Sequence, residues 1–143
     1  MNNLRKIGLK SEKKAAKKVN AKIVKGSGSL WYEKGDYETE NFVFQNKFCK
    51  NSYQLTINNI KKAKKDALTK NKDFIFSIEF RGIFYYLFER VLINEDLEKS
   101  LNLLPLKINK SLKLTEKNIN NNYLINEEFI FIDEDNFLNL KFI

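Results

Sequence analysis

The sequence predicts an α/β fold with one mixed sheet and a less regular, strand-containing C-terminal extension. Apolar residues recur at helical spacing in two lysine-rich segments, and elsewhere they alternate or run continuously as they do in strands. The chain has 143 residues, 43% of them hydrophobic, which is enough to bury a core. Strands flanked by helices in this order are typical of a mixed sheet covered by helices. We therefore expect a single domain over residues 1–143, with its core at about 11–90 and an extension at about 91–143.

The first half of the core is predicted to be a helix followed by strands. Ser11 can cap a helix over residues 11–20, with Glu12 in its first turn, where the helix dipole favours an acid. In the segment 41–48 apolar side chains alternate with a more polar second face, which indicates a longer strand. Between them, Gly-containing turns separate short extended segments at residues 23–24, 30–32 and 36–38.

The second half of the core is predicted to be a helix and a hairpin. Thr56 can cap a helix at 56–70, in which apolar residues recur at helical spacing and lysines occupy the other faces. A strongly apolar strand follows at 73–80, and Arg81-Gly82 turns it into a partner at 83–88. The extension is predicted to hold a short helix before Pro105, an Asn-rich loop and two strands, at 95–104, 118–122, 129–132 and 137–142.

Composition excludes several kinds of chemistry. Histidine is absent and Cys49 is the one cysteine, so the chain has no histidine-dependent nucleophile, no structural zinc site of the usual kind and no intrachain disulfide. Any catalysis must use carboxylates, lysines, hydroxyls and a hard metal ion. No segment approaches the roughly 20 apolar residues of a membrane span, and the N-terminus lacks the apolar stretch of a signal peptide. We therefore expect a cytoplasmic protein without a membrane partner.

The net charge of +8 is concentrated in two blocks. Residues 1–25 carry nine basic and one acidic side chain, and residues 61–90 carry eight and four, whereas the rest of the chain is acidic. Lysine blocks of this kind are typical of proteins that neutralise nucleic-acid phosphates. A solvated helix surface without a partner is the other interpretation of the same charge.

The segment from Gly35-Asp36 to Gln45-Asn46-Lys47 is the most informative for chemistry. A turn places a carboxylate at the mouth of one strand, and the neighbouring strand presents a metal-capable oxygen and a lysine on one face, two residues apart. Phosphodiester hydrolysis with a divalent metal needs an acid to hold the ion, a second oxygen ligand and a cation that orients water or stabilises charge. None of these roles requires histidine.

In this ordered set the sequence resembles the PD-(D/E)XK nuclease superfamily, particularly its small phage and archaeal-type Holliday-junction resolvases. The resemblance covers about residues 11–80 and implies a restriction-endonuclease-like αβββαβ core. The elements that carry it are a glutamate on a helix, a Gly/Ser segment, Gly-Asp, a strand with a ligand-x-Lys motif, Ser-Tyr, a helix and an apolar strand. In this chain they are Glu12, 26–29, Gly35-Asp36, Gln45-Asn46-Lys47, Ser52-Tyr53, 56–70 and 73–80.

The resemblance implies a role for each motif residue. Asp36 would be the central ligand of Mg²⁺ or Mn²⁺, with Gln45 and the backbone carbonyl of Asn46 completing the protein ligands. Lys47 would orient water or stabilise charge, and Glu12 would assist the metal or its water. Ser27 and Tyr53 would lie near the scissile or adjacent phosphate. The lysine blocks, in turn, predict that Lys13, Lys17, Lys61 and Lys65 contact the DNA backbone.

Position 45 departs from the superfamily pattern, which usually has Asp or Glu there. A Gln amide oxygen can still bind Mg²⁺, but the lost charge lowers metal affinity unless Glu38 or Glu40 compensates. The leading hypothesis is a metal-dependent, structure-selective DNA endonuclease that acts on branched DNA as a homodimer, in a bacterial or phage-infected cell. Symmetry-related strands in a four-way junction favour a dimer, for which the strands at 74–88 or the extension are the expected faces. The alternatives are a catalytically weakened or inactive nucleic-acid-binding protein of the same fold, which Gln45 favours, and a phage protein–protein interaction module.

Overall fold

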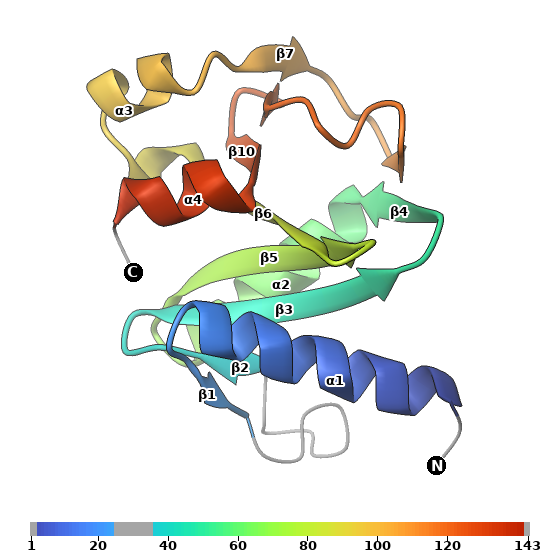
Figure 1. Cartoon of the computed structure of the whole chain (residues 1–143). Helices are drawn as coiled ribbons and strands as arrows, with labels where there is room; N and C mark the ends of the chain where they lie inside the picture. The colour runs from blue at the N-terminus through green and yellow to red at the C-terminus, as the bar shows by residue number, and fades with distance from the viewer. Residues whose placement is uncertain (1–2, 25–35, 142–143) are drawn as a thin grey trace.

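The structure, a computed structural model, describes residues 3–24 and 36–141 (Figure 1). The first half of the chain forms α1 (Asn3–Lys18), β1 (Lys22–Ile23), β2 (Tyr37–Glu38), β3 (Phe42–Cys49), β4 (Ser52–Thr56), α2 (Ile57–Thr69), β5 (Asp73–Phe80) and β6 (Ile83–Glu89). The second half forms the 3₁₀ turn η1 (Arg90–Leu92), α3 (Glu95–Ser100), β7 (Leu104–Leu106), β8 (Ser111–Thr115), β9 (Tyr123–Ile125), β10 (Phe129–Asp133) and α4 (Glu134–Leu140).

Eight of the described strands form one mixed sheet in the order β1-β2-β3-β5-β6-β10-β9-β7. β3 and β5 are parallel, as are β7 and β9, and the other neighbours are antiparallel. β4 and β8 form a separate two-stranded sheet. The expected α/β fold and αβββαβ core are confirmed, with α1, β1 to β3, α2 and β5 in that order and β4 added before α2.

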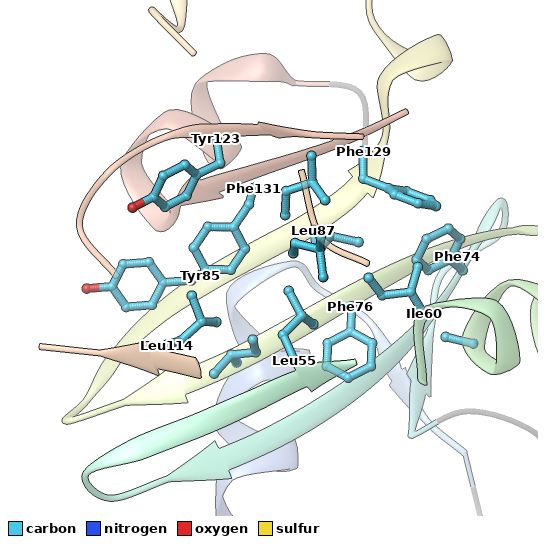
Figure 2. Close-up of a cluster of buried hydrophobic side chains, with 14 of the residues drawn as sticks. Leu55, Ile60, Phe74, Phe76, Tyr85, Leu87, Leu114, Tyr123, Phe129 and Phe131 are labelled. Carbon is cyan, nitrogen blue, oxygen red and sulfur yellow. The ribbon is translucent and has the colours of Figure 1, made fainter. Parts of the chain in front are cut away.

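Helices cover both faces of the sheet, because its central strands are apolar on both sides (Figure 1). On one face α1, α3 and α4 pack over a core that includes Phe44, Tyr86 and Phe88. On the other face α2, β4 and β8 enclose a second core, in which Phe74, Phe76 and other aromatic side chains gather (Figure 2). The successive residues of β3 therefore point alternately toward α1 and toward α2.

The first helix begins earlier than the sequence suggests. α1 runs from Asn3 to Lys18, so the prediction that Ser11 caps it is wrong. Ser11 lies in the middle of the helix, is 2% exposed and faces β3. Glu12 is consequently also in the helix interior, and the dipole of a first turn does not explain it.

The extension differs most from expectation. The predicted strand at 137–142 is wrong, since this segment belongs to α4, whose cap Asp133 accepts a hydrogen bond from the backbone of Asn136 at 3.0 Å. The predicted helix at 95–104 ends at Ser100. β4, β7, β8 and β9 were not predicted, because these strands have three to five residues and weak patterns. The proposed strand at 30–32 lies outside the described residues.

The strands at 74–88 cannot serve as the dimer face that the sequence suggested. β5 and β6 lie in the interior of the sheet, between β3 and β10, and nearly all their side chains are buried within the chain. Among the described helices, none is long and apolar enough to cross a membrane.

Candidate active site

The candidate site lies where the ladder between β2 and β3 ends. β2 pairs with β3 at Tyr37–Phe44 and Glu38–Val43, and the backbone N–H of Asp36 donates to the carbonyl of Phe44 at 2.9 Å. Two residues further along β3, the N–H of Asn46 donates to Oδ2 of Asp36 at 2.7 Å, so a carboxylate occupies the position of the next ladder partner. Because the N–H and C=O of one strand residue point to the same side, the Asn46 carbonyl faces the same edge as Asp36.

Glu12 reaches this edge from α1. Its carboxyl group hydrogen-bonds Asp36 and is held partly buried beside that acid. Burial, followed by the negative charge of Asp36, raises the pKa of Glu12 to about 7 from an ordinary 4.5, and the nearby Lys47 ammonium opposes the rise. Glu12, Asp36 and Lys47, which lie far apart in the sequence, therefore meet at one place in the fold.

Gln45 and Lys47 share a face of β3 with Val43 and Cys49, as the two-residue spacing predicts. Gln45 is partly buried and Lys47 is exposed. Asn46 points to the opposite face, toward α1, where it is 7% exposed. β3 therefore carries the exposed side chain of Lys47 next to Asn46, whose backbone N–H binds Asp36.

The side chain of Asn46 takes part in buried hydrogen bonds that the sequence does not reveal. Its Nδ2 donates to Oγ of Ser11 at 2.8 Å, and its Oδ1 accepts from Oγ of Ser77 at 2.7 Å. Tyr37 in turn donates from its hydroxyl to Ser77 Oγ at 2.8 Å. Ser77 lies opposite Asn46 in the parallel register of β3 and β5, which is a tertiary pairing that neither segment signals alone.

Glu79 is a second residue that the sequence did not single out. It follows Ser77 on the α1 face of β5, is 3% exposed, and its Oε2 lies 3.5 Å from Nζ of Lys14. Glu38, considered as a compensating acid, contacts Lys70 and Lys72 at 3.1 and 3.6 Å, and hydrogen bonding and charge from these lysines lower its pKa. Glu38 is thus held by two cations from the segment after α2, while Glu40 is exposed in the turn after β2.

The residues predicted to face DNA are distributed over both faces of the sheet. Tyr53 is partly buried, and its ring lies 6.1 Å from that of Phe76, so it packs against the α2-side core. Ser27 lies outside the described residues. The four lysines of this prediction are exposed, and they are Lys13 and Lys17 on α1 and Lys61 and Lys65 on α2.

The donor set at the site fits a hard divalent cation. Two carboxyl groups in hydrogen-bond contact repel each other when both are ionised, and a cation between them removes that cost. Within residues 3–24 and 36–141, no group of three His, Cys, Asp or Glu side chains is close enough to hold a metal. Mg²⁺ commonly binds through one or two carboxylates and keeps several waters, so Glu12 and Asp36, with the Asn46 carbonyl, would fit such an ion.

No protein-family model matches the sequence, and no curated protein sequence matches it. Among solved structures, the chain is similar to the 1.6 Å structure of Hjc from Archaeoglobus fulgidus, a Holliday junction resolvase from an archaeal hyperthermophile. The TM-score is 0.48 with 12% sequence identity, over 77% of this chain and 84% of that chain. A function for this chain must therefore be argued from Glu12, Asp36 and Lys47 themselves.

Proposed function

We propose that this protein is a metal-dependent DNA endonuclease. The observation that carries the proposal is the contact of Glu12 with Asp36 beside Lys47, at the edge where the Asn46 backbone is directed outward. Two acids, neutral oxygen ligands and a lysine are the groups that hydrolysis of a phosphodiester with a hard metal requires. The mixed α/β fold and the basic surface of the chain agree with this proposal.

Each residue of the site has a proposed task. Asp36 and Glu12, with Gln45 and the Asn46 carbonyl, would hold Mg²⁺ or Mn²⁺, which supplies a Lewis acid and an activated water when bound. Lys47 is exposed and near Glu12, so its ammonium can contact the scissile phosphate and stabilise the charge that develops there. The backbone N–H of Asn46 would keep Asp36 in place, because it donates a hydrogen bond to Oδ2 of that residue at 2.7 Å.

The proposed substrate is branched DNA, and the proposed acting form is a homodimer. Lysines on α1 and α2 lie on opposite faces of the sheet that carries the site. A duplex bound at the site edge would have cations on either side of it, and a junction offers more than one duplex arm to such a surface. Cutting of two symmetry-related strands requires two copies of the site, which is the reason for the dimer.

The test is a cleavage assay on a synthetic four-way junction and a matched linear duplex, with Mg²⁺, Mn²⁺ or EDTA. Asp36→Asn keeps an oxygen to accept from the Asn46 N–H but removes the charge that a metal needs. We expect it to reduce the cleavage rate by at least about 100-fold while junction binding changes little, since a metal contributes several kcal/mol to such a transition state. Asp96→Asn, in the exposed first turn of α3, is the matched control and should cleave as wild type does.

The second candidate function is a DNA-binding protein with little or no activity, and Gln45 is the observation that favours it. Under this alternative, wild type binds the junction without cutting it in either metal. Gln45→Glu then becomes the informative variant, because it adds the missing negative charge and should raise metal affinity. Cutting by wild type would exclude the alternative, and a protein that neither binds nor cuts would contradict both candidates.

A further inference from the structure

Four buried polar side chains connect the elements that carry the candidate active site. They are Ser11 on α1, Tyr37 on β2, Asn46 on β3 and Ser77 on β5, each at most 7% exposed, and we name them the Asn46 cluster. Among the described residues, five non-aromatic polar or charged residues are buried, and three of them belong to this cluster. Buried polar groups are costly unless paired, so their concentration at one place in the sheet requires an explanation.

The hydrogen bonds of the Asn46 cluster form one connected chain. The Tyr37 hydroxyl donates to Ser77 Oγ at 2.8 Å, Ser77 donates to Asn46 Oδ1 at 2.7 Å, and Asn46 Nδ2 donates to Ser11 Oγ at 2.8 Å. A flipped Asn46 amide would donate to Ser77 and accept from Ser11, and Ser77 would then donate to the Gln45 carbonyl, 3.4 Å from its Oγ, so the amide bonds both serines in either orientation. The cluster therefore links α1 and β2 to β3 and β5.

Three members of the Asn46 cluster are sequence neighbours of the site residues. Ser11 precedes Glu12, Tyr37 follows Asp36, and Asn46 lies between Gln45 and Lys47. Asn46 also donates its own backbone N–H to Asp36 Oδ2 at 2.7 Å. A shift in the backbone of any of these three residues would move a carboxylate or the lysine, because only one peptide unit separates them.

Stability alone does not demand such a cluster. Replacing both partners of a buried hydrogen bond by apolar groups of the same shape is often nearly neutral, and the surrounding core is already rich in Phe and Ile. What a buried polar cluster adds is a fixed geometry, because its donors and acceptors lose their partners when the elements that carry them shift.

We propose that Asn46, Ser77 and Tyr37 are positioning residues that hold Glu12, Asp36 and Lys47 at working distance from one another. This assignment rests on the proposed nuclease function. None of the three side chains reaches the solvent edge, so they act through Asp36, Glu12 and Lys47 rather than on DNA. Asn46 thus contributes its backbone to the edge of the site and its side chain to the alignment of that edge.

The structure provides a matched pair of variants for the test. Tyr37→Phe removes the hydroxyl that begins the cluster, and Ser77→Ala is the second variant should the first not fold. Tyr86→Phe is the control: Tyr86 lies in the same core, stacks on Phe137 as Tyr37 stacks on Phe44, and its hydroxyl has no hydrogen-bond partner within the described residues. Both changes remove one buried phenolic oxygen, but only Tyr37→Phe interrupts the cluster.

Two measurements are made on each variant: steady-state cleavage of the junction, and hydrogen exchange of the Asn46 backbone amide in metal-free protein. For Tyr37→Phe we expect kcat to fall about 10- to 100-fold with KM for DNA within about twofold, since misplacement by about 1 Å can cost about 100-fold. The Asn46 amide, whose acceptor is Asp36, should exchange about tenfold faster relative to the other amides of β3 and β5. Tyr86→Phe should leave both quantities at their wild-type values.

The outcomes separate this inference from the proposed function. Wild-type kcat and unchanged Asn46 exchange in Tyr37→Phe overturn the inference, as does a raised KM with unchanged kcat, which would assign the cluster to DNA binding. Equal effects of Tyr37→Phe and Tyr86→Phe also overturn it, because they would mean a general loss of packing. A wild type that cuts no DNA, combined with faster Asn46 exchange in Tyr37→Phe, overturns the nuclease proposal and leaves the positioning of Asp36 supported.

Discussion

Glu12 is the residue whose behaviour depends most on its surroundings. In the sequence of α1, Glu12 is an acid among lysines, as on an ordinary helix surface. In the fold its carboxyl group is partly buried and hydrogen-bonds Asp36. Burial and a like charge both favour the protonated form, which is why its pKa rises to about 7. Below about pH 7 the protonated form of Glu12 is favoured, so a cation held by both acids would compete with that proton.

This shift predicts a pH dependence of stability. Since the pKa of Glu12 is higher in the folded protein than in the unfolded chain, the folded state binds a proton more tightly. The contribution of Glu12 to the free energy of unfolding is therefore largest below about pH 4.5 and is lost as pH rises through about 7. Glu12→Gln should remove this decline and make the protein about 1 to 2 kcal/mol more stable than wild type at pH 8, a value reduced for partial exposure.

Urea unfolding in metal-free buffer at several pH values between 4.5 and 8 measures the effect. Glu40→Gln, at an exposed glutamate, is the control and should follow the wild-type curve. A constant difference between Glu12→Gln and wild type across this range would contradict the shift.

At the scale of elements, the local sequence around Ser11 predicts a helix start that α1 does not have. Ser11 followed by an acid has the pattern of a helix cap, but α1 begins at Asn3, and the Ser11 hydroxyl in the helix interior accepts a hydrogen bond from Asn46. At the C-terminal end the opposite occurs, because a helix forms at Glu134–Leu140 where the sequence predicts a strand at 137–142. Asp133 with Glu134 and Asp135 is a capping pattern that precedes α4, whereas the apolar residues after it suggested a strand.

Replacing glycine by alanine should have opposite effects on the free energy of unfolding in α1 and in the β5–β6 turn. Gly8 lies inside α1, and a Cβ built on it meets nothing within 4 Å, so Gly8→Ala should raise the free energy of unfolding by about 0.5 to 1 kcal/mol. Gly82 has φ +83° in the hairpin turn, where alanine is strained, so Gly82→Ala should lower it. Chemical denaturation of both variants checks the signs, and a loss of stability in Gly8→Ala would mean that α1 does not begin at Asn3.

At the scale of the whole molecule, the sheet separates the two lysine blocks. α1 and α2 cover opposite faces (Figure 1). The candidate site lies where the ladder between β2 and β3 ends. Some lysines of these helices are held by acids of the same chain, such as Lys64 with Glu89 at 2.9 Å and Lys18 with Glu134 at 2.9 Å. The exposed lysines at 13, 17, 61 and 65 remain the best candidates for phosphate contacts.

Salt dependence of junction binding tests that surface. If Lys13 and Lys17 each neutralise one phosphate, the double change to alanine should reduce the slope of log affinity against log salt by about 2, since each contact in B-DNA contributes about 0.9. The same change at Lys61 and Lys65 should have a similar effect if both faces contact DNA. Lys99→Ala combined with Lys107→Ala, at exposed lysines of the extension, is the control and should leave the slope unchanged. Unchanged slopes in all three variants would assign the charge to solvation.

The sequence by itself determined the fold class, the long strands, the cap of α2 at Thr56 and the order of acid, amide and lysine along the chain. These features follow from periodicity and local capping, which act over a few residues and are therefore visible in a short window. Tertiary structure alone decided that Glu12 contacts Asp36, that Asn46 turns its side chain inward, and that Ser77 lies beside it. Such contacts depend on the register between β3 and β5 and on the packing of α1, which are set by the burial of whole faces and not by any local segment.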